Sequence, residues 1–337
     1  MSNFLKALRR EPVDATPVWF MRQAGRYQKE YRELRRKYDI MQIARNPELI
    51  TYVTLLPEKN MEIDALILFS DIMLPLEAMG IKFEIQPAVG PIVENPVRTM
   101  EDVEKLRIID PADDLPFVFE AIKMIKSSSK LPLIGFSGAP FTLLSYMVEG
   151  GPSRNFLRVK KFMHTNRDAF NLVMEKLTES ISLYLREQIN AGVDALQIFD
   201  SWVGALSPAD YREFILPFMK KIMSQIQDVP VIHFGVNTGG MLDLMANAGG
   251  DVIGVDWRVR IDEAWKKFPQ KGIQGNLDPA LLLTDWETVK RATVEILNAI
   301  RGRTGHIFNL GHGVLPDTNP EILRRLVDFV HQESSRK

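Results

Sequence analysis

The stretch Ala191-Gly192-Val193-Asp194-Ala195-Leu196-Gln197-Ile198-Phe199 contains the join that decides the fold, a helix end followed at once by a strand. Upstream, the amphipathic pattern from Arg167 to Asn190 predicts a long helix, and Ala191-Gly192 is typical of a helix stop. Downstream, the run Ala195–Phe199 is almost continuously apolar, as expected of a strand that helices cover on both faces. The stretch therefore predicts an α/β fold.

The same alternation of short apolar runs and longer amphipathic ones extends along the whole chain. We expect eight strands, namely Val18–Met21, Ala65–Phe69, Leu131–Phe136, Ala195–Phe199, Val231–Phe234, Val252–Asp256, Gly272–Gly275 and His306–Leu310. Eight strands with helices between them predict a single-domain (β/α)₈ TIM barrel over residues 1–337. An open doubly wound sheet is the alternative, and Gly272–Gly275 is the weakest of the strand signals.

Helix signals and one insertion complete the predicted elements. Proline in a first turn opens a helix at Pro47, and Ser207-Pro208-Ala209-Asp210 combines an N-cap with an acid in the first turn. Asp285 to Ile300 and Pro320 to His331 supply the last two helices. The region Ile81–Val97, with extended runs on either side of Ala88-Val89-Gly90, predicts a short β-hairpin inserted after the second strand.

Composition excludes several classes of protein. Lys+Arg 42 against Asp+Glu 43 gives a net charge of −1, which removes any bulk electrostatic attraction to nucleic acid or to a membrane surface. The chain contains no cysteine, so disulfides, thiolate nucleophiles and thiolate-ligated metals are excluded. No signal peptide or spanning segment is visible, and we expect a cytoplasmic protein.

The loop Met21-Arg22-Gln23-Ala24-Gly25-Arg26-Tyr27 follows the first expected strand. Arginine has a planar, permanently charged fork suited to carboxylates, and an Ala-Gly backbone lets an anion approach the peptide N–H groups. The sequence therefore predicts an anion-binding loop, with a solvated turn carrying two surface arginines as the alternative.

Four motifs resemble those of the uroporphyrinogen decarboxylase family. They are Pro17-Val18-Trp19-Phe20-Met21-Arg22-Gln23-Ala24-Gly25-Arg26-Tyr27, Gly135-Phe136-Ser137-Gly138-Ala139-Pro140-Phe141-Thr142, Tyr146-Met147-Val148-Glu149-Gly150-Gly151 and Asn309-Leu310-Gly311-His312-Gly313-Val314. Because they run from near one end of the chain to near the other, the resemblance covers essentially the whole sequence.

The resemblance implies an activity that needs neither a metal nor a prosthetic group. The four acetate side chains of uroporphyrinogen III would become methyl groups, giving coproporphyrinogen III and carbon dioxide, in a homodimer with facing active sites. It implies that Asp71 is the central acid, which accepts the pyrrole N–H groups and stabilises positive charge on the macrocycle. An ionised carboxylate there would lower the energy of the ring cation that takes up the electron pair of the breaking bond.

The resemblance also implies substrate-binding positions. From the Arg-bracketed loop itself, our hypothesis is that Arg22 and Arg26 bind carboxylates together with the backbone N–H groups of Gln23, Ala24 and Gly25, and Arg22 is a candidate proton relay. The acidic side chains of the substrate would also contact Tyr146, Ser201 and His312. Met41 stands where many members of the family carry Phe, and could cover an apolar face of the macrocycle.

The residues alone leave other interpretations open for these positions. Asp71 could cap a helix, Tyr146 could be a core tyrosine, Ser201 could cap the next helix and His312 could lie in a glycine turn. In a barrel, however, the strand ends meet at one rim. Since these residues and Arg22 all follow expected strands, we expect them to converge.

Two other functions compete with decarboxylation. A corrinoid or thiol methyltransferase would use zinc bound by cysteine and histidine, and the absence of cysteine argues against it. Asp200 and Asp256 end strands, but they lack the spacing of metal ligands. A non-catalytic tetrapyrrole carrier would keep Arg22 and Arg26 but would not need Asp71.

Overall fold

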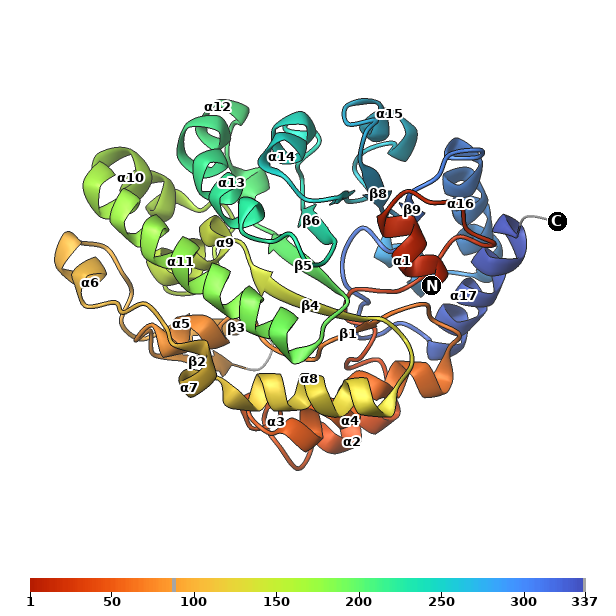
Figure 1. The fold of residues 1–337 in the computed structure, drawn as a ribbon, viewed down its shortest axis with the longest axis horizontal. Coiled ribbons are helices and arrows are strands. Elements are labelled where there is room, and N and C mark those ends of the chain that lie inside the picture. Colours follow the sequence, from red (N-terminus) through yellow and green to blue (C-terminus); the bar gives the residue numbers. More distant parts are fainter. Residues whose placement is uncertain (87–88, 336–337) are drawn as a thin grey trace.

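The computed structural model describes residues 1–86 and 89–335 and contains a curled sheet of seven parallel strands. Figure 1 shows the sheet with helices along its outside and both termini on the same side of the molecule. The order is β1-β4-β5-β6-β7-β8-β9, and every strand overlaps a predicted run, which confirms the α/β fold. The strands are β1 (Leu66–Ile67), β4 (Leu133–Gly138), β5 (Ala195–Asp200), β6 (Val231–Gly235), β7 (Val252–Gly254), β8 (Gly272–Gln274) and β9 (His306–Ile307).

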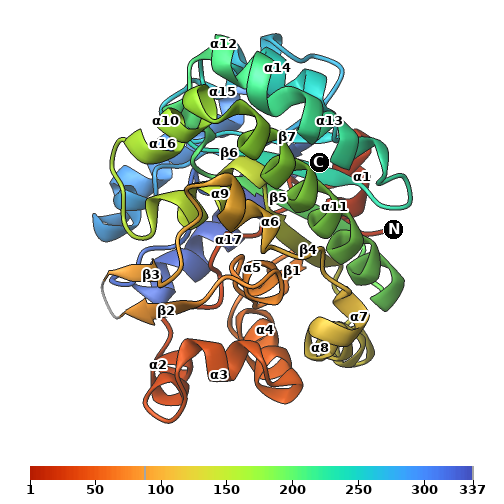
Figure 2. The ribbon, with the colours of Figure 1, turned by 90° about the vertical axis from the view of Figure 1, so that its left-hand side faces the viewer.

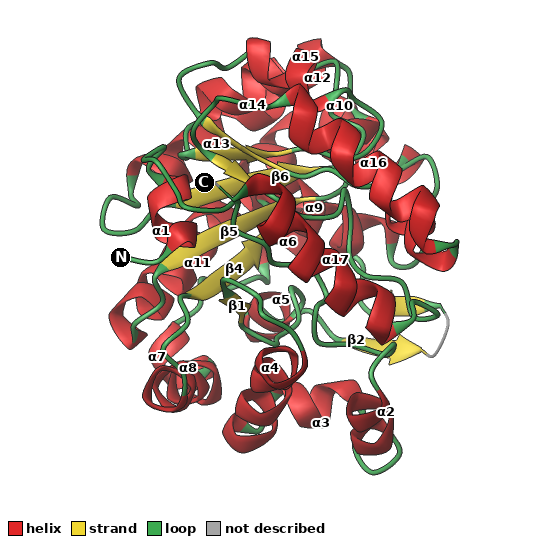
Figure 3. Cartoon of the chain, turned by 90° about the vertical axis from the view of Figure 1, so that its right-hand side faces the viewer, coloured by secondary structure: helices red, strands yellow, loops and turns green. Residues whose placement is uncertain are grey.

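Helices connect the strands and cover the outer face of the sheet (Figure 3). The α-helices are α1 (Asn3–Leu8), α2 (Lys29–Arg35), α3 (Ile40–Ala44), α4 (Pro47–Asn60), α5 (Leu74–Ala78), α6 (Met100–Glu104), α7 (Pro111–Asp114), α8 (Pro116–Ser128), α9 (Pro140–Glu149), α10 (Leu157–Thr165), α11 (Arg167–Ala191), α12 (Pro208–Asp210), α13 (Leu216–Ser224), α14 (Leu242–Ala248), α15 (Ile261–Lys266), α16 (Trp286–Ala299) and α17 (Pro320–Ser334). Two 3-10 turns, η1 (Val203–Ala205) and η3 (Pro279–Leu283), and one π-helical turn, η2 (Tyr211–Ile215), complete the list. In the described part of the chain, no helix combines the length and the apolar character needed to cross a membrane.

The predicted helix boundaries follow from capping. Gly192, after α11, adopts φ 112°, a left-handed conformation that glycine reaches without strain. The side chains of Ser207 and Asp285 each accept a hydrogen bond from a backbone N–H of the first turn, at the starts of α12 and α16. Local sequence therefore fixes where these helices begin and end.

A separate antiparallel pair lies between β1 and α6. Its strands are β2 (Phe83–Gln86) and β3 (Gly90–Val93), and Figure 2 shows them apart from the main sheet. The turn predicted around Ala88 falls partly on residues 87 and 88, which lie outside the described residues. The Val93 N–H donates to the Gly150 carbonyl (2.8 Å), which ties β3 to the end of α9.

The sheet is not closed, and the predicted strand Val18–Met21 is not a strand. Val18 makes only a single parallel bridge, to Phe308. Side-chain oxygens take two backbone N–H groups that a ladder would need, because Gln23 Oε1 accepts from Phe20 (3.1 Å) and Asn309 Oδ1 accepts from Met21 (3.2 Å). Such bonds compete with regular pairing, so the closed eight-stranded barrel is corrected to an open, curled sheet.

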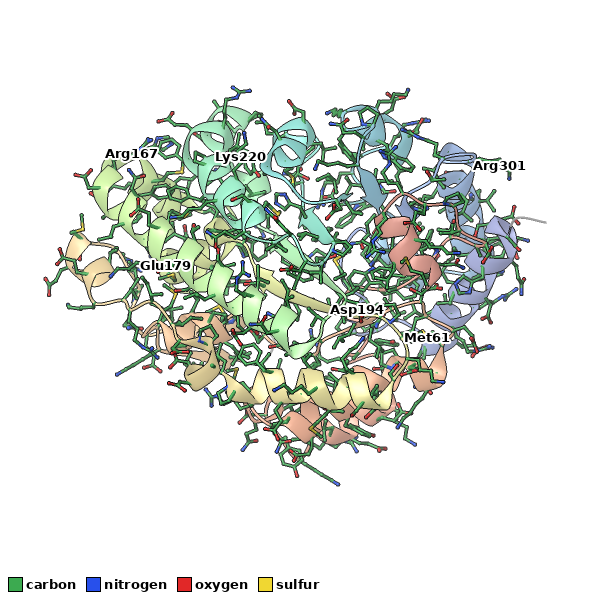
Figure 4. The ribbon with its side chains drawn as sticks, in the orientation of Figure 1. Met61, Arg167, Glu179, Asp194, Lys220 and Arg301 are labelled. Atoms are coloured by element: carbon green, nitrogen blue, oxygen red, sulfur yellow. The ribbon has the colours of Figure 1, made fainter. Side chains whose placement is uncertain are left out.

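The same pair of hydrogen bonds between an aspartate and the backbone of a neighbouring segment recurs where strands begin. Asp64, Asp194 and Asp251 each stand just before a strand, and each carboxylate accepts the N–H of a residue opposite, on Val18, Leu133 and Val231, at 2.7, 2.7 and 2.8 Å. In every case the aspartate N–H also donates to the carbonyl of that same residue. Figure 4 labels Asp194, at the turn between α11 and β5. Val18 is therefore held in the same way as the first residues of true neighbouring strands.

The hydrophobic core has two layers separated by the sheet. Side chains alternate between faces along a strand, and on β5 Leu196 and Ile198 pack outward with the helices while Ala195 packs inward. The inner cluster also holds Trp19 and Phe234, both buried. This filling of the sheet's concave face leaves the carboxyl ends of the strands as the place where polar side chains gather.

Candidate functional site

The loop after Val18–Met21 is held by the side chain of Gln23, which is buried. The Gln23 Oε1 accepts from the Phe20 N–H (3.1 Å), and its Nε2 donates to the Ala65 carbonyl (3.1 Å). The Tyr27 hydroxyl donates to the backbone carbonyl of Gln23 (2.6 Å). The Gln23 side chain therefore ties the loop to the approach to β1 and is turned away from any ligand.

Two of the three loop N–H groups expected to bind an anion already have partners. The N–H of Gln23 donates to the Phe20 carbonyl (2.9 Å), and that of Gly25 donates to Gln28 Oε1 (3.1 Å). Within residues 1–86 and 89–335, the Ala24 N–H has no such partner. Because the turn is tight, the N–H groups of Gln23 and Gly25 are used within the loop. Of the three backbone N–H groups expected to bind an anion, only that of Ala24 is left to do so.

The charges of several candidate site residues act on the side chain of Arg22. It lies in the left-handed region at φ 61° and its side chain is exposed. The surrounding protein nevertheless lowers the pKa of Arg22, chiefly by desolvation, while Tyr146 and Asp71 raise it and Arg26 lowers it further. Tyr146, Asp71 and Arg26 are therefore the residues whose charges act on the Arg22 guanidinium.

Asp71 lies between β1 and α5 and is half-buried. Its Oδ1 accepts the Met73 N–H (2.8 Å), so one oxygen serves the backbone just before α5, although Met73 and not Asp71 is the N-cap. Burial raises the pKa of Asp71, and the Met73 hydrogen bond and Arg22 partly oppose the rise. In the described part of the chain, Oδ2 has no hydrogen-bond partner, so it is the oxygen that a ligand could use.

Tyr146 and Ser201 lie on neighbouring elements of the same edge. Tyr146, on α9, packs edge-on against Trp202 with ring centroids 6.0 Å apart, and burial raises the pKa of its hydroxyl, which keeps it a donor. Ser201 follows β5 directly and caps no helix, because η1 has no side-chain cap. Its neighbour Trp202 is instead held by Thr142 Oγ1, which accepts the Trp202 N–H (3.3 Å).

His312 follows β9 and is neutral. Its Nδ1 accepts the Gly313 N–H (2.8 Å), which leaves the proton on Nε2. Burial lowers the pKa of His312 to about 4, with the positive charges of Arg22 and Arg258 acting in the same direction and Asp256 opposing them. The side chain therefore offers an Nε2–H donor over the neutral pH range.

Arg26 and Met41 make no hydrogen bond to Arg22 or Asp71 in the described part of the chain. Arg26 is exposed, and its carbonyl accepts from Arg32 Nη1 (2.9 Å), which fastens the loop to α2. Met41 is half-buried on α3 and packs against the main core. No polar contact among the described residues joins Met41 to Arg22 or Asp71.

The sequence interpretation missed Arg258 and Trp202. Each comes two residues after an aspartate at the end of a predicted strand, Asp256 and Asp200, so position at the strand edge was the available signal. Asp256 is no metal ligand here, because it accepts the Asn237 N–H (2.7 Å) and pairs with Arg258. In the described residues there is no cluster of three or more side chains suited to a metal ion.

The fold and the site together define an α/β protein of the TIM-barrel-like class, with arginines, a half-buried acid and a neutral histidine gathered at the carboxyl ends of its strands. The chain belongs to the uroporphyrinogen decarboxylase family, because the model of the family described as "Uroporphyrinogen decarboxylase (URO-D)" matches residues 1–333.

Individual relatives agree with this family over nearly the whole chain. The uroporphyrinogen decarboxylase of Bacillus subtilis is 51% identical over 338 residues, covering 99% of this chain and 96% of that protein. The enzyme of the same name from Thermus thermophilus is 50% identical over 330 residues, covering 97% of each. Among solved structures, a methyltransferase from Methanosarcina mazei matches with a TM-score of 0.80 at 23% identity over 98% of both chains, which shows a shared fold.

Proposed function

We propose that this chain decarboxylates uroporphyrinogen III, converting its four acetate side chains to methyl groups and giving coproporphyrinogen III and carbon dioxide. The observation that carries the proposal is the identity of about half of all positions, over nearly full length, with enzymes named uroporphyrinogen decarboxylase. The arrangement of Asp71 beside Arg22 supports it, because the reaction needs both anion binding and stabilisation of positive charge.

Asp71 stabilises the cation formed when a pyrrole carbon is protonated. The bond to the carboxyl group breaks only if its electron pair has an acceptor, and the cationic ring is that acceptor. A charge pair about 4 Å apart contributes roughly 4 kcal/mol at an effective dielectric of about 20. Enzymes lower barriers by about 8–23 kcal/mol, so Asp71 supplies part of the effect, and orientation and a correctly placed proton donor supply the rest.

The remaining residues hold the carboxylates of the substrate. Arg22 and Arg26 bind them through charged N–H groups, with the Ala24 N–H beside them. The Tyr146 hydroxyl, Ser201 Oγ and His312 Nε2–H donate to further acidic side chains, and Met41 covers an apolar face of the macrocycle. Gln23 acts through the loop it fastens.

Arg22 is the proposed proton relay. The lowered pKa of its guanidinium, caused chiefly by desolvation, makes it a stronger acid than arginine in water. An Arg22→Lys variant tests this role, because a relay predicts a changed pH–rate profile and solvent isotope effect. A normal profile together with a raised KM would assign Arg22 to binding alone.

The proposal also covers the domain structure, the oligomeric state and the cofactor requirement of the enzyme. Residues 1–337 form one catalytic domain, β2 and β3 are the arms of one hairpin inserted after the second predicted strand, and the enzyme acts as a cytoplasmic homodimer without metal or prosthetic group. Sedimentation at several protein concentrations tests the dimer, and activity after extensive dialysis against a chelator tests metal independence.

Anaerobic incubation with uroporphyrinogen III, followed by oxidation and chromatography of the porphyrins, tests the function directly. The expected product has lost four carboxyl groups and yields stoichiometric carbon dioxide. Binding of the porphyrinogen without loss of carboxyl groups would instead identify a tetrapyrrole carrier. If the protein does not bind the porphyrinogen, both functions are rejected.

A further inference from the structure

Arg258 lies at the strand edge in a turn that a buried carboxylate holds. Asp256, of which only 1% is exposed, accepts the Asn237 N–H (2.7 Å), the Arg258 N–H (3.2 Å) and Arg258 Nη1 (2.6 Å). These bonds join the turn after β6 to the turn after β7. The position of the guanidinium is therefore set by a side chain that cannot itself reach solvent.

The guanidinium is also oriented by an aromatic face. Arg258 Cζ stands 4.1 Å from the centroid of the Trp257 ring, a stacking arrangement that fixes the plane of the fork. The side chain of Arg258 remains 46% exposed. Among the described residues Nη1 alone has a side-chain partner, so the other N–H groups of a preorganised fork are open to a ligand.

This fork belongs to the same rim as the proposed site. A Cβ on Gly311 would lie 2.5 Å from the Trp257 backbone nitrogen, so the turns after β7 and β9 are in direct contact. His312, next in sequence, is influenced electrostatically by both Arg22 and Arg258. In the sheet β7 is separated from β1 by β4, β5 and β6, so the turn that carries Arg258 and the turn that carries Asp71 follow different, non-adjacent strands of the same edge.

We propose that Arg258 is a substrate-binding residue that holds one carboxylate of the macrocycle together with the Nε2–H of His312. The inference rests on the proposed function and extends it. Uroporphyrinogen III carries an acetate and a propionate on every pyrrole ring, so carboxylates that Arg22 and Arg26 do not hold need further donors. Arg258 gives one of them a charged donor.

Two sources of this carboxylate are distinguishable. The acetates are lost in the reaction whereas the propionates remain, so a propionate at Arg258 predicts that an Arg258 variant weakens uroporphyrinogen and coproporphyrinogen equally. An acetate there predicts that only uroporphyrinogen is weakened. The KM for uroporphyrinogen and the inhibition constant of coproporphyrinogen, each measured for the wild type and the Arg258 variant, distinguish the two cases.

The test uses Arg258→Gln and Arg258→Lys, with Arg260→Gln as the matched control. Arg260 lies two residues later, is 76% exposed and pairs with Asp262 (3.0 Å), so it reports the loss of one positive charge on the same turn. For Arg258→Gln we expect KM to rise about tenfold or more with a smaller change in kcat, as for loss of a charge-assisted hydrogen bond. Arg258→Lys should recover part of the loss, and Arg260→Gln should leave KM within twofold of the wild type.

Removing Arg258 leaves the buried Asp256 carboxylate without its charge partner, so folding needs its own control. The double variant Asp256→Asn/Arg258→Gln removes both charges together and should show the same rise in KM with a melting temperature nearer the wild type. An unchanged KM in Arg258→Gln and in the double variant, or an equal rise in Arg260→Gln, would overturn the proposal.

A second probe separates this proposal from the proposed function. Binding of oxidised uroporphyrin III, followed by quenching of tryptophan fluorescence, requires no turnover. Weaker binding in Arg258→Gln but not in Arg260→Gln supports the role of Arg258 even if the wild type releases no carbon dioxide. Equal binding by the wild type and Arg258→Gln rejects it, whatever the activity.

Discussion

Gly313 packs directly against the side chain of Arg22. A Cβ on Gly313 would lie 2.7 Å from Arg22 Cγ, closer than real Cβ atoms approach other atoms, and 3.1 Å from Nε, which is also tight. The backbone of Gly313 is not in the left-handed region, so the glycine is required for space. The position of Arg22 therefore depends on the absence of a side chain at Gly313, a residue near the other end of the sequence.

Gly313→Ala should displace Arg22 without unfolding the chain. The added methyl group forces the flexible arginine stem to move, and a displacement of about 1 Å at a substrate-positioning group costs up to about a hundredfold in rate. We expect kcat/KM for uroporphyrinogen III to fall at least tenfold, while circular dichroism and the melting temperature stay close to the wild type.

Gly240→Ala is the matched control for this change. No heavy atom lies within 4 Å of the position of its Cβ, and its backbone is also outside the left-handed region. This variant should retain wild-type kcat/KM. An equal loss of kcat/KM in Gly313→Ala and Gly240→Ala would show that displacement of Arg22 is not the cause.

The strands and the helix ends could be predicted because their causes are local. The apolar run that becomes β5 and the left-handed Gly192 before it are visible in the sequence, and both occur in the structure as predicted. The strand predicted at Val18–Met21 is absent because Gln23, in the loop that follows, and Asn309, distant in sequence, supply side-chain acceptors for the N–H groups of Phe20 and Met21. Local apolar character does not reveal such competition.

The candidate site shows the same division. Residues that directly follow a predicted strand, such as Asp71 and Ser201, could be placed at the correct edge from the alternation alone. The inward turn of Gln23 could not, since it depends on the Ala65 carbonyl and on a compact loop. Arg258 was missed because its fork is set by the buried Asp256 and the Trp257 ring, contacts that only the folded chain provides.

Asp71→Asn should strongly lower kcat and leave the fold as stable as before or more so. Loss of a charge interaction of roughly 4 kcal/mol corresponds to about a thousandfold in kcat. Burial raises the pKa of Asp71, so the folded chain binds this proton more tightly than the unfolded chain does. Ionisation therefore costs folding free energy as pH rises above the unfolded value of about 4, and the amide avoids that cost.

Urea unfolding at neutral pH and turnover of uroporphyrinogen III measure the two halves of this prediction. The wild type should also lose activity on acidification at a higher pH than an ordinary aspartate would cause. Near-normal turnover by Asp71→Asn would remove the cation-stabilising role.

Thr142→Val should weaken the support of Tyr146. The Thr142 hydroxyl donates to Asp200 Oδ1 (3.4 Å) and accepts the Trp202 N–H (3.3 Å), and Trp202 packs on Tyr146. The nearly isosteric valine leaves these partners unpaired, at a cost of about 1–3 kcal/mol in unfolding free energy. We expect kcat/KM to fall severalfold.

Thr178→Val provides the comparison for that variant. Thr178 is buried on α11, and its hydroxyl has no hydrogen-bond partner among the described residues. Removing an unsatisfied hydroxyl should be neutral or slightly stabilising, with normal activity. A similar loss in both threonine variants would attribute the effect to valine itself.

His331→Gln should lower stability more at acidic than at alkaline pH. His331 Nε2 lies 2.7 Å from Asp64 Oδ2, the same oxygen that accepts the Val18 N–H, so this contact fastens α17 to the place where the sheet stays open. Burial lowers the pKa of His331, but the hydrogen bond and charge of Asp64, with Asp328 and Glu62, raise it more, and the balance is a raised pKa.

A histidine whose pKa is raised by folding contributes stability that is fully present below the unfolded value of about 6.5, and this contribution disappears as pH rises through the folded value. The difference in unfolding free energy between the wild type and His331→Gln should therefore be larger at about pH 6 than at about pH 9, as measured by urea denaturation at both pH values. The side chain of His331 is 26% exposed, so solvent and salt weaken the pair and added salt should reduce the difference at the lower pH. A difference that is constant with pH would mean that the histidine contributes by packing, and that its charge does not act on Asp64.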